Sequence, residues 1–175
     1  VRDRLPDVLL IVAGEGPATK ELQRRTTRLR LTDNVAFIGY QQRGQQLWDC
    51  YAAGDIFVFA SKTETQGLVL LEALALGVPV IATGELGAQD MLKDCGGALL
   101  VPSDVADFAA QTLRLLCDPK LRRVLGENAR MDASHWSIEQ TTAGLVAYYA
   151  SLIEGGDSPG TPLTNRGSCA EEKKS

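Results

Sequence analysis

Short apolar runs alternate with amphipathic stretches along most of the chain. Five runs predict buried strands, because each is a continuous series of apolar residues that ends in glycine or a polar turn; they span residues 8–13, 35–38, 56–60, 80–82 and 98–101. The spacing of apolar and charged positions predicts helices at residues 18–31, 45–53, 68–76, 108–117, 121–125 and 138–154. Strands that alternate with helices over short connections predict βαβ units. We therefore expect an α/β fold, a doubly wound and mainly parallel Rossmann-like sheet with helices on both faces.

The alternation of strands and helices stops near residue 154. Residues 155–175 are rich in glycine, proline, serine and charge and offer little apolar surface to bury. A segment of that composition does not compensate the entropy of ordering its backbone. The sequence therefore predicts one domain over residues 1–154 and a disordered tail over residues 155–175.

Composition excludes several classes of function. The net charge of −4 disfavours non-specific binding to nucleic acid, which needs a basic surface. The four cysteines are far apart and the chain has one histidine, so no group of residues has the spacing of a metal site. No apolar run approaches the roughly 20 residues that span a bilayer. Unpaired cysteines of this kind are typical of a reducing cytoplasm, where we expect the protein to be.

The loop before residue 68 is the most informative part of the sequence. Ligands of open α/β sheets bind beyond the carboxyl ends of the strands, so the loops at residues 14–17, 39–44, 61–66 and 83–89 are candidates. In the third loop a helix begins at Gly67, and the backbone N–H groups of Gly67, Leu68 and Val69 would carry the positive end of its dipole. We expect an anion site there; the alternative is that Gly67 only makes the turn.

Glu72 is the only charged residue between Gly67 and Gly77. A helix that is apolar all round is buried on most sides, and an unpaired buried carboxylate is strongly unfavourable. Glu72 therefore needs partners, and the hydroxyl groups of a bound ligand would serve. The alternative is that Glu72 is a surface residue on the one solvent-exposed face of the helix. The sequence leaves both interpretations open.

Residues 61–83 read SKTETQGLVLLEALALGVPVIAT, with Glu64 and Glu72 separated by seven residues. This run resembles the Glu-x7-Glu signature of the retaining glycosyltransferases of family 4, the group 1 class. Three further segments resemble the same family, namely VAGEGP at residues 12–17, VAFIGY at 35–40 and GGALLVP at 96–102. The resemblance covers roughly residues 5–154.

This resemblance implies the C-terminal, nucleotide-sugar-binding domain of the two-domain architecture called GT-B. Such a domain holds a UDP- or GDP-sugar whose sugar is moved to an acceptor bound by an N-terminal domain. We expect that domain to be absent here and the fragment alone to be inactive. The resemblance also implies that no metal ion or other cofactor is needed, and that any membrane contact is made through the missing domain.

The resemblance implies a role for each matching residue. Glu64 would contact the donor sugar near the reacting carbon, and Glu72 would hold the ribose hydroxyl groups. The remaining positions are Gly67, Leu68 and Val69 at the diphosphate, Gly39, Tyr40 and Gln41 at the base, and Gly14 and Gly16 along the cleft. The family's arginine and lysine that neutralise the diphosphate have no counterpart in this sequence. Lys62 would be a partial substitute, or else an ordinary solvated lysine.

Three other functions compete with the transferase. A nicotinamide-binding Rossmann domain would use Gly14 and Gly16, but Thr19 stands where the third glycine of that fingerprint belongs. A hydrolase would need His135 and a G-x-S-x-G turn, and the sequence contains no such turn. A non-catalytic nucleotide-sugar sensor or scaffold on the same fold stays open. Because both glutamates and the glycine between them are present, the transferase is favoured.

Overall fold

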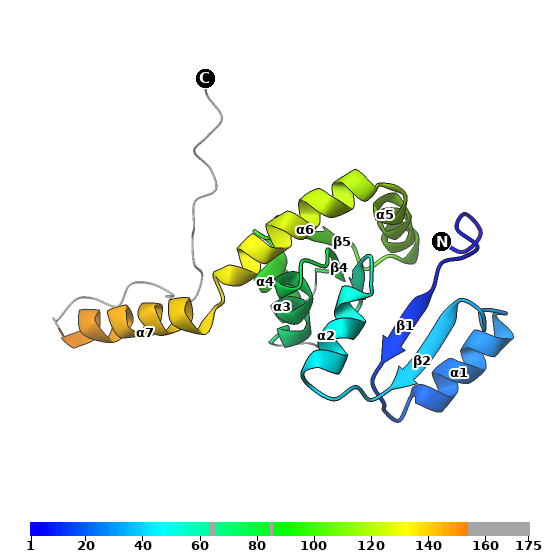
Figure 1. Cartoon of the computed structure of the whole chain (residues 1–175), viewed down its shortest axis with the longest axis horizontal. Helices are drawn as coiled ribbons and strands as arrows, with labels where there is room; N and C mark the ends of the chain where they lie inside the picture. The colour runs from blue at the N-terminus through cyan, green and yellow to red at the C-terminus, as the bar shows by residue number, and fades with distance from the viewer. Residues whose placement is uncertain (64–65, 85, 154–175) are drawn as a thin grey trace, which may run out of the picture. The chain divides into compact units, whose positions relative to one another are not determined.

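The computed structural model describes residues 1–63, 66–84 and 86–153. The chain divides into two compact units, Val1–Asp132 and the residues from Ala133 onward, and each is described by itself. The elements in order are β1 (Leu10–Ala13), α1 (Thr19–Arg28), β2 (Val35–Gly39), α2 (Gln45–Ala52), β3 (Phe57–Phe59), α3 (Leu68–Ala75), β4 (Val80–Thr83), α4 (Leu86–Leu92), β5 (Ala98–Val101), α5 (Val105–Cys117), α6 (Pro119–Ser134) and α7 (Ile138–Ile153) (Figure 1).

All strand pairs are parallel, as the alternation of strands and helices predicts. The strand β1 pairs with β2, and β4 lies between β3 and β5. The α/β fold class is therefore confirmed. Within the described part of the chain, however, β1 and β3 do not pair, so the strands form two sheets where we expected one.

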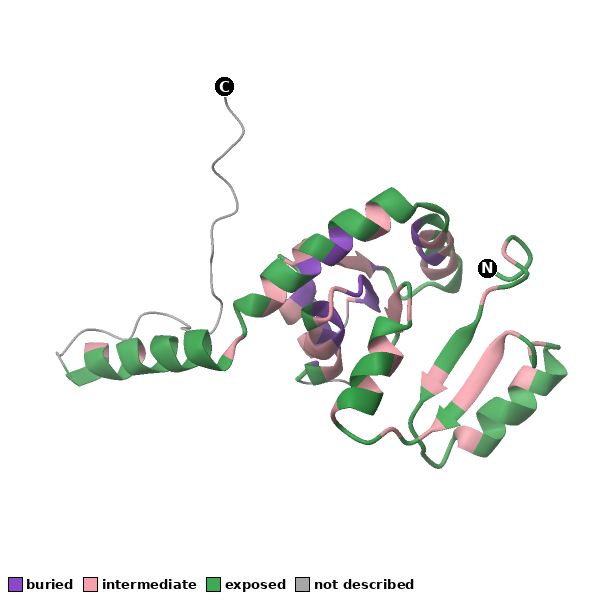
Figure 2. Ribbon diagram, viewed as in Figure 1, coloured by how far each residue is buried: buried purple, intermediate pink, exposed green. Residues whose placement is uncertain are grey.

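The core lies around β4, whose four residues are all buried (Figure 2). Ile81 packs in a cluster with Val101, Leu115 and Leu125, which come from β5, α5 and α6. Because successive side chains of a strand point to opposite faces, Val80 and Ala82 face the other way. Helices α3, α4 and α5 all contact β4. This sheet is thus covered by helices on both faces, as a doubly wound fold requires.

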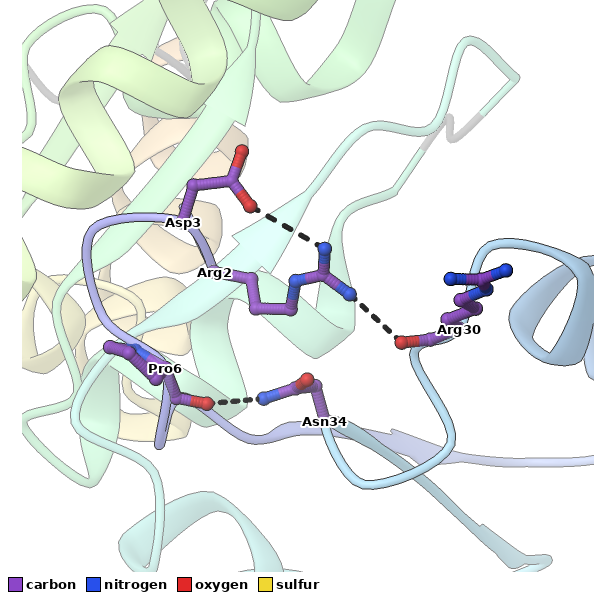
Figure 3. Close-up of polar contacts among 5 residues, drawn as sticks. All are labelled: Arg2, Asp3, Pro6, Arg30 and Asn34. Carbon is purple, nitrogen blue, oxygen red and sulfur yellow. Dashed lines mark hydrogen bonds and ion pairs between the residues drawn. The ribbon is translucent and has the colours of Figure 1, made fainter.

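The segment before β1 is held by the turn before β2 (Figure 3). The side-chain amide of Asn34 donates to the carbonyl oxygens of Pro6 (2.7 Å) and Val8 (2.8 Å). Arg2 donates to the carbonyl oxygen of Arg30 at 2.8 Å. Strand pairing does not reach these three carbonyl oxygens, so the side-chain bonds satisfy them instead. The same bonds fix the residue at which β1 begins to pair with β2.

Helix α6 passes directly over two turns that contain glycine. A Cβ atom at Gly126 would lie 2.6 Å from the carbonyl oxygen of Gly77, and one at Gly97 would lie 2.4 Å from the Cα atom of Ala129. Gly77 has a φ of +75° and ends α3, and Arg130 donates to the carbonyl oxygen of Leu76 at 3.0 Å. Backbone contacts, rather than flexible side chains, therefore set the position of α6.

The structure corrects two sequence predictions. The loop expected at residues 83–89 ends early, because helix α4 begins at Leu86, and the helix expected at 121–125 spans Pro119–Ser134. The predicted tail at 155–175 and the domain end at 154 lie outside the described residues and stay predictions. None of the described helices is long and apolar enough to cross a membrane.

Candidate functional site

The loops after β1 and β2 line an open hollow of about 640 Å³ at the carboxyl ends of these strands. Gly14, Gly16 and Gly39, three of the residues predicted from the sequence, line it together with Lys20 and Phe37. The N–H of Gly14 donates to the carbonyl oxygen of Gly39 at 2.7 Å, which holds the two loops together. The structure thus brings these three glycines to one place, at the edge of the sheet where ligands bind.

Glu15 is a contributor to this hollow that sequence reasoning missed. One oxygen of its carboxylate, Oε1, accepts a bond from the N–H of Tyr40 at 3.4 Å. A Cβ atom on Gly39, whose φ is +68°, would lie 3.1 Å from the same oxygen. Tyr40 itself is exposed, and the side-chain amide of Gln41 donates to the carbonyl oxygen of Ile38 at 2.7 Å. The loop at 39–41 is therefore held in shape by a contact with Glu15 and by the bond from Gln41 to Ile38.

Gly67 begins α3 in the left-handed conformation, with a φ of +66° and no side chain to cap the helix. It is buried, and a Cβ atom there would lie 2.4 Å from the Cε atom of Met91. The next two residues, Leu68 and Val69, have N–H groups in the first helical turn, where no carbonyl of the helix can reach them. This helix end carries the partial positive charge that the sequence predicted for an anion site.

The structure gives Glu72 two partners that the sequence did not reveal. The hydroxyl of Tyr51 donates to its Oε2 atom at 2.9 Å, and Arg43 donates to its Oε1 atom at 3.0 Å. The Glu72 side chain is 23% exposed and that of Arg43 is 74% exposed. A carboxylate offers about four acceptor positions. Residues in the described part of the chain occupy two of them, so Glu72 is neither an unpaired buried acid nor a purely solvated one. The other two positions accept no bond from these residues.

Tyr51 fixes the direction of the Glu72 carboxylate. Burial, followed by the hydrogen bond to Glu72, raises the pKa of the Tyr51 hydroxyl, so the hydroxyl keeps its proton and acts as a donor at neutral pH. The ring of Tyr51 packs on that of Phe57 with centroids 5.4 Å apart. The ion pair with Arg43 is largely exposed and screened by solvent. Of the two partners, Tyr51 is the stronger constraint on Glu72.

Thr83 is another residue that the sequence did not single out. It ends β4 at the carboxyl edge of the three-stranded sheet and is 5% exposed. Its hydroxyl has no hydrogen-bond partner among the described residues, and a buried hydroxyl without one costs about 1–3 kcal/mol. A water molecule or a ligand at this edge can satisfy such a group. Glu64, the predicted catalytic residue, lies outside the described residues.

A further polar cluster joins the turn before β5 to α6. The thiol of Cys95 donates to the Oδ2 atom of Asp132 at 3.1 Å, and the N–H of Gly97 donates to the same oxygen at 3.0 Å. Burial, and next the hydrogen bond to Asp132, raise the pKa of the Cys95 thiol to about 12. The cluster therefore holds the turn before β5 against α6. Cys95 is not an activated nucleophile, because a nucleophilic cysteine needs a lowered pKa.

We therefore expect Cys95 to resist alkylation while Cys117, which is exposed, reacts readily. At about pH 8 a thiol with a pKa near 12 is ionised in only about one molecule in ten thousand, and the thiolate is the reactive form. The measurement is iodoacetamide labelling of the native protein, followed by peptide mass spectrometry. Equal labelling of Cys95 and Cys117 before unfolding would contradict the contact with Asp132.

The parallel sheets, the glycine at the start of α3 and the carboxylate one turn later define an α/β domain of the Rossmann type with a site at its carboxyl edge. Residues 1–132 match the family described as glycosyl transferases group 1. The chain therefore belongs to this family, and the fold expected for the C-terminal domain of a GT-B glycosyltransferase is confirmed.

Three similar proteins illustrate the relationship. The sulfoquinovosyl transferase SQD2 of Arabidopsis thaliana is 34% identical over 146 residues, which cover 81% of this chain and 28% of that protein. The C-terminal domain of the group 1 glycosyl transferase LpcC of Francisella tularensis superposes with a TM-score of 0.69 at 30% identity, covering 78% of this chain and 74% of that one. Anabaena HepE in complex with UDP and glucose superposes with a TM-score of 0.70 at 26% identity, covering 81% and 41%.

The chain spans about a third of the length of the curated relatives that it matches, 28% and 35% for two of them. By contrast, it covers most of the separately determined LpcC domain. The matched part of the chain thus corresponds to the C-terminal domain of a group 1 glycosyl transferase.

Proposed function

We propose that this domain binds the nucleotide-sugar donor, a UDP- or GDP-sugar, of a retaining glycosyltransferase. The observation that supports this best is the Glu72 carboxylate, which Tyr51 holds in a fixed direction while two acceptor positions stay available. Two neighbouring hydroxyl groups, as on a ribose, would fill those positions. The similar HepE structure is a complex with UDP and glucose, which supports the same ligand class for this chain.

In this proposal each part of the donor meets a different segment of the site. The diphosphate lies at the start of α3, where Gly67 allows a close approach and the N–H groups of Leu68 and Val69 donate. The base lies along the loop at 39–41, and Gly14 and Gly16 line the cleft. Glu64 faces the sugar near the reacting carbon. Because backbone N–H groups and a helix dipole stabilise the diphosphate, the reaction needs no metal ion.

Transfer itself requires an acceptor held against the donor, since positioning supplies much of the rate. The proposal assigns the acceptor to an N-terminal domain of the same polypeptide, which would form the other wall of the site. The domain described here would then bind donor but turn over none. The complete enzyme would act in the cytoplasm and would meet a membrane only through its N-terminal domain.

The test is calorimetry of residues 1–175 with UDP, GDP and ADP, each with and without a chelator. We expect UDP or GDP to bind more tightly than ADP, and we expect the chelator to leave that affinity unchanged. We also expect the fragment to transfer no sugar. The absence of binding by all three nucleotides would overturn the proposal. Binding that vanishes with the chelator would refute the metal-independent site.

A further inference from the structure

The Glu72 carboxylate is covered near one oxygen and open to solvent near the other. Tyr51 bonds to the Oε2 atom and its ring packs against that of Phe57, so this side of the carboxylate faces the protein. Arg43 bonds to the Oε1 atom at 3.0 Å, and its side chain is 74% exposed. A ligand that comes from solvent therefore reaches Glu72 next to the guanidinium of Arg43.

Arg43 is placed by the turn that leads into α2. The next residue, Gly44, has a φ of +115°, which strains any residue with a side chain, although nothing lies within 4 Å of a Cβ atom there. The glycine is thus needed for the direction of the chain and not for space. Tyr51 lies further along α2, so both partners of Glu72 come from one short segment of the chain.

The guanidinium of Arg43 has more donors than its ion pair uses. It carries five N–H groups in a fixed plane, stays charged at neutral pH and accepts no hydrogen bond. Within the described part of the chain it bonds to Glu72 alone. A ligand atom that bonds to the Oε1 atom of Glu72 can therefore receive a hydrogen bond from Arg43 as well.

A hydroxyl group fits this pair of charges better than a charged group does. It donates its proton to one acceptor and offers two lone pairs to donors. Between Glu72 and Arg43 the carboxylate accepts the proton and the guanidinium donates to the oxygen, so both functions of the hydroxyl are satisfied. Glu72 would repel a phosphate oxygen at the same point, and Arg43 would repel an ammonium group.

We propose that Arg43 is a specificity-determining residue that recognises a ribose hydroxyl of the donor together with Glu72. The hydroxyl donates to the Oε1 atom of Glu72 and accepts a hydrogen bond from Arg43. This inference rests on the proposed function, because it takes a nucleotide whose ribose lies at Glu72. It adds that Arg43 helps the site to distinguish ribonucleotides from deoxynucleotides, since a missing hydroxyl leaves the polar groups of the site unpaired.

The test combines a change in the protein with a change in the ligand. Calorimetry gives the affinities of the whole chain and of Arg43→Gln for UDP or GDP, whichever binds, and for its 2′-deoxy and 3′-deoxy forms. An exposed ion pair contributes little to stability, so the variant should fold like the wild type, which circular dichroism checks. The matched control is Arg123→Gln, because Arg123 is 75% exposed and also pairs with an acid, Glu127.

We expect the wild type to bind the ribonucleotide at least about tenfold more tightly than either deoxy form. In Arg43→Gln this preference should fall at least about fivefold for one of the two deoxy forms, because the lost hydrogen bond and the lost hydroxyl belong to one contact. The affinity for that deoxy form itself should stay nearly unchanged. Arg123→Gln should change neither the affinities nor the preference.

Three results with Arg43→Gln would overturn the inference while the proposed function stands. Equal weakening of the ribonucleotide and both deoxy forms would place Arg43 at the phosphates or the base. Tighter binding of the ribonucleotide would mean that Arg43 competes with the ribose for Glu72. An unchanged preference would mean that Arg43 contacts no hydroxyl. If the wild type binds no nucleotide at all, the proposed function and this inference are both wrong.

Discussion

Replacing Glu72 by glutamine should lower the affinity of residues 1–175 for UDP or GDP, whichever binds, by at least about tenfold. A hydrogen bond to a charged group contributes about 1.5–3 kcal/mol, and about 1.4 kcal/mol corresponds to a factor of ten. The substitution keeps the shape of the side chain but removes the charge that Tyr51 and Arg43 now hold in place. It also puts an amide donor where a ribose hydroxyl would need an acceptor. Calorimetry with the nucleoside diphosphate measures the change.

Two matched variants make this result specific. Glu127→Gln removes an exposed carboxylate whose pair with Arg123 spans 3.9 Å on α6, and it should leave the affinity unchanged. Glu64→Gln should also leave diphosphate binding nearly unchanged but lower kcat of the complete enzyme, because Glu64 is proposed to face the sugar. If Glu72→Gln binds like the wild type, or if both glutamates affect diphosphate binding equally, the assigned roles are wrong.

Gly97→Ala should lower the free energy of unfolding by about 3 kcal/mol, at the upper end of the usual cost of overpacking. The added Cβ atom would lie 2.4 Å from the Cα and 2.6 Å from the backbone nitrogen of Ala129. Because those atoms belong to the backbone of α6, no rotamer change relieves the contact. The helix must move, and the bonds from Cys95 and Gly97 to Asp132 would lengthen with it. Urea denaturation followed by circular dichroism gives the change.

Gly144→Ala is the control for this substitution. It also replaces glycine by alanine, but in α7, where nothing lies within 4 Å of the added Cβ atom. Alanine is the better helix former by about 1 kcal/mol, so this variant should be unchanged or slightly more stable. A Gly97→Ala protein as stable as the wild type would mean that α6 does not pack against this turn as described.

The apolar pattern placed every predicted strand within two residues of its observed position, but its expectation of burial is met in full only by β4, and β1 is largely exposed. The run ALLV at 98–101 forms β5 over the predicted residues, and 45–53 forms α2 to within one residue. The apolar pattern did not predict α4, because the seven residues of this helix span barely two turns and show no clear period. In α6, Gly126 interrupts a helical pattern because the carbonyl of Gly77 leaves no room for a side chain. That requirement is a tertiary one, and a local pattern does not contain it.

The sequence predicted the glycines of the site, but it did not predict which side chains contact Glu72. Glycines that follow a strand or begin a helix mark turns, so Gly14, Gly39 and Gly67 were identifiable from their positions, and all three have a positive φ. The partners of Glu72 come from α2 and the loop before it, and only the contact between α2 and α3 brings Tyr51 within reach. Glu15 and Thr83 were missed for the same reason, since their significance depends on neighbours distant in the sequence.

The conformation of Gly67 also has a practical meaning for protein engineering. Any L-residue there would be strained by a φ of +66° and would collide with the side chain of Met91. A library that aims to change the preferred base should therefore leave this position constant. Tyr40 has no such restriction, because its φ is not positive and its side chain is widely exposed, whereas the Gln41 side chain bonds to the carbonyl oxygen of Ile38 and helps to hold the loop. If the base lies along this loop as proposed, randomising position 40 explores new base contacts while the start of α3 keeps its shape.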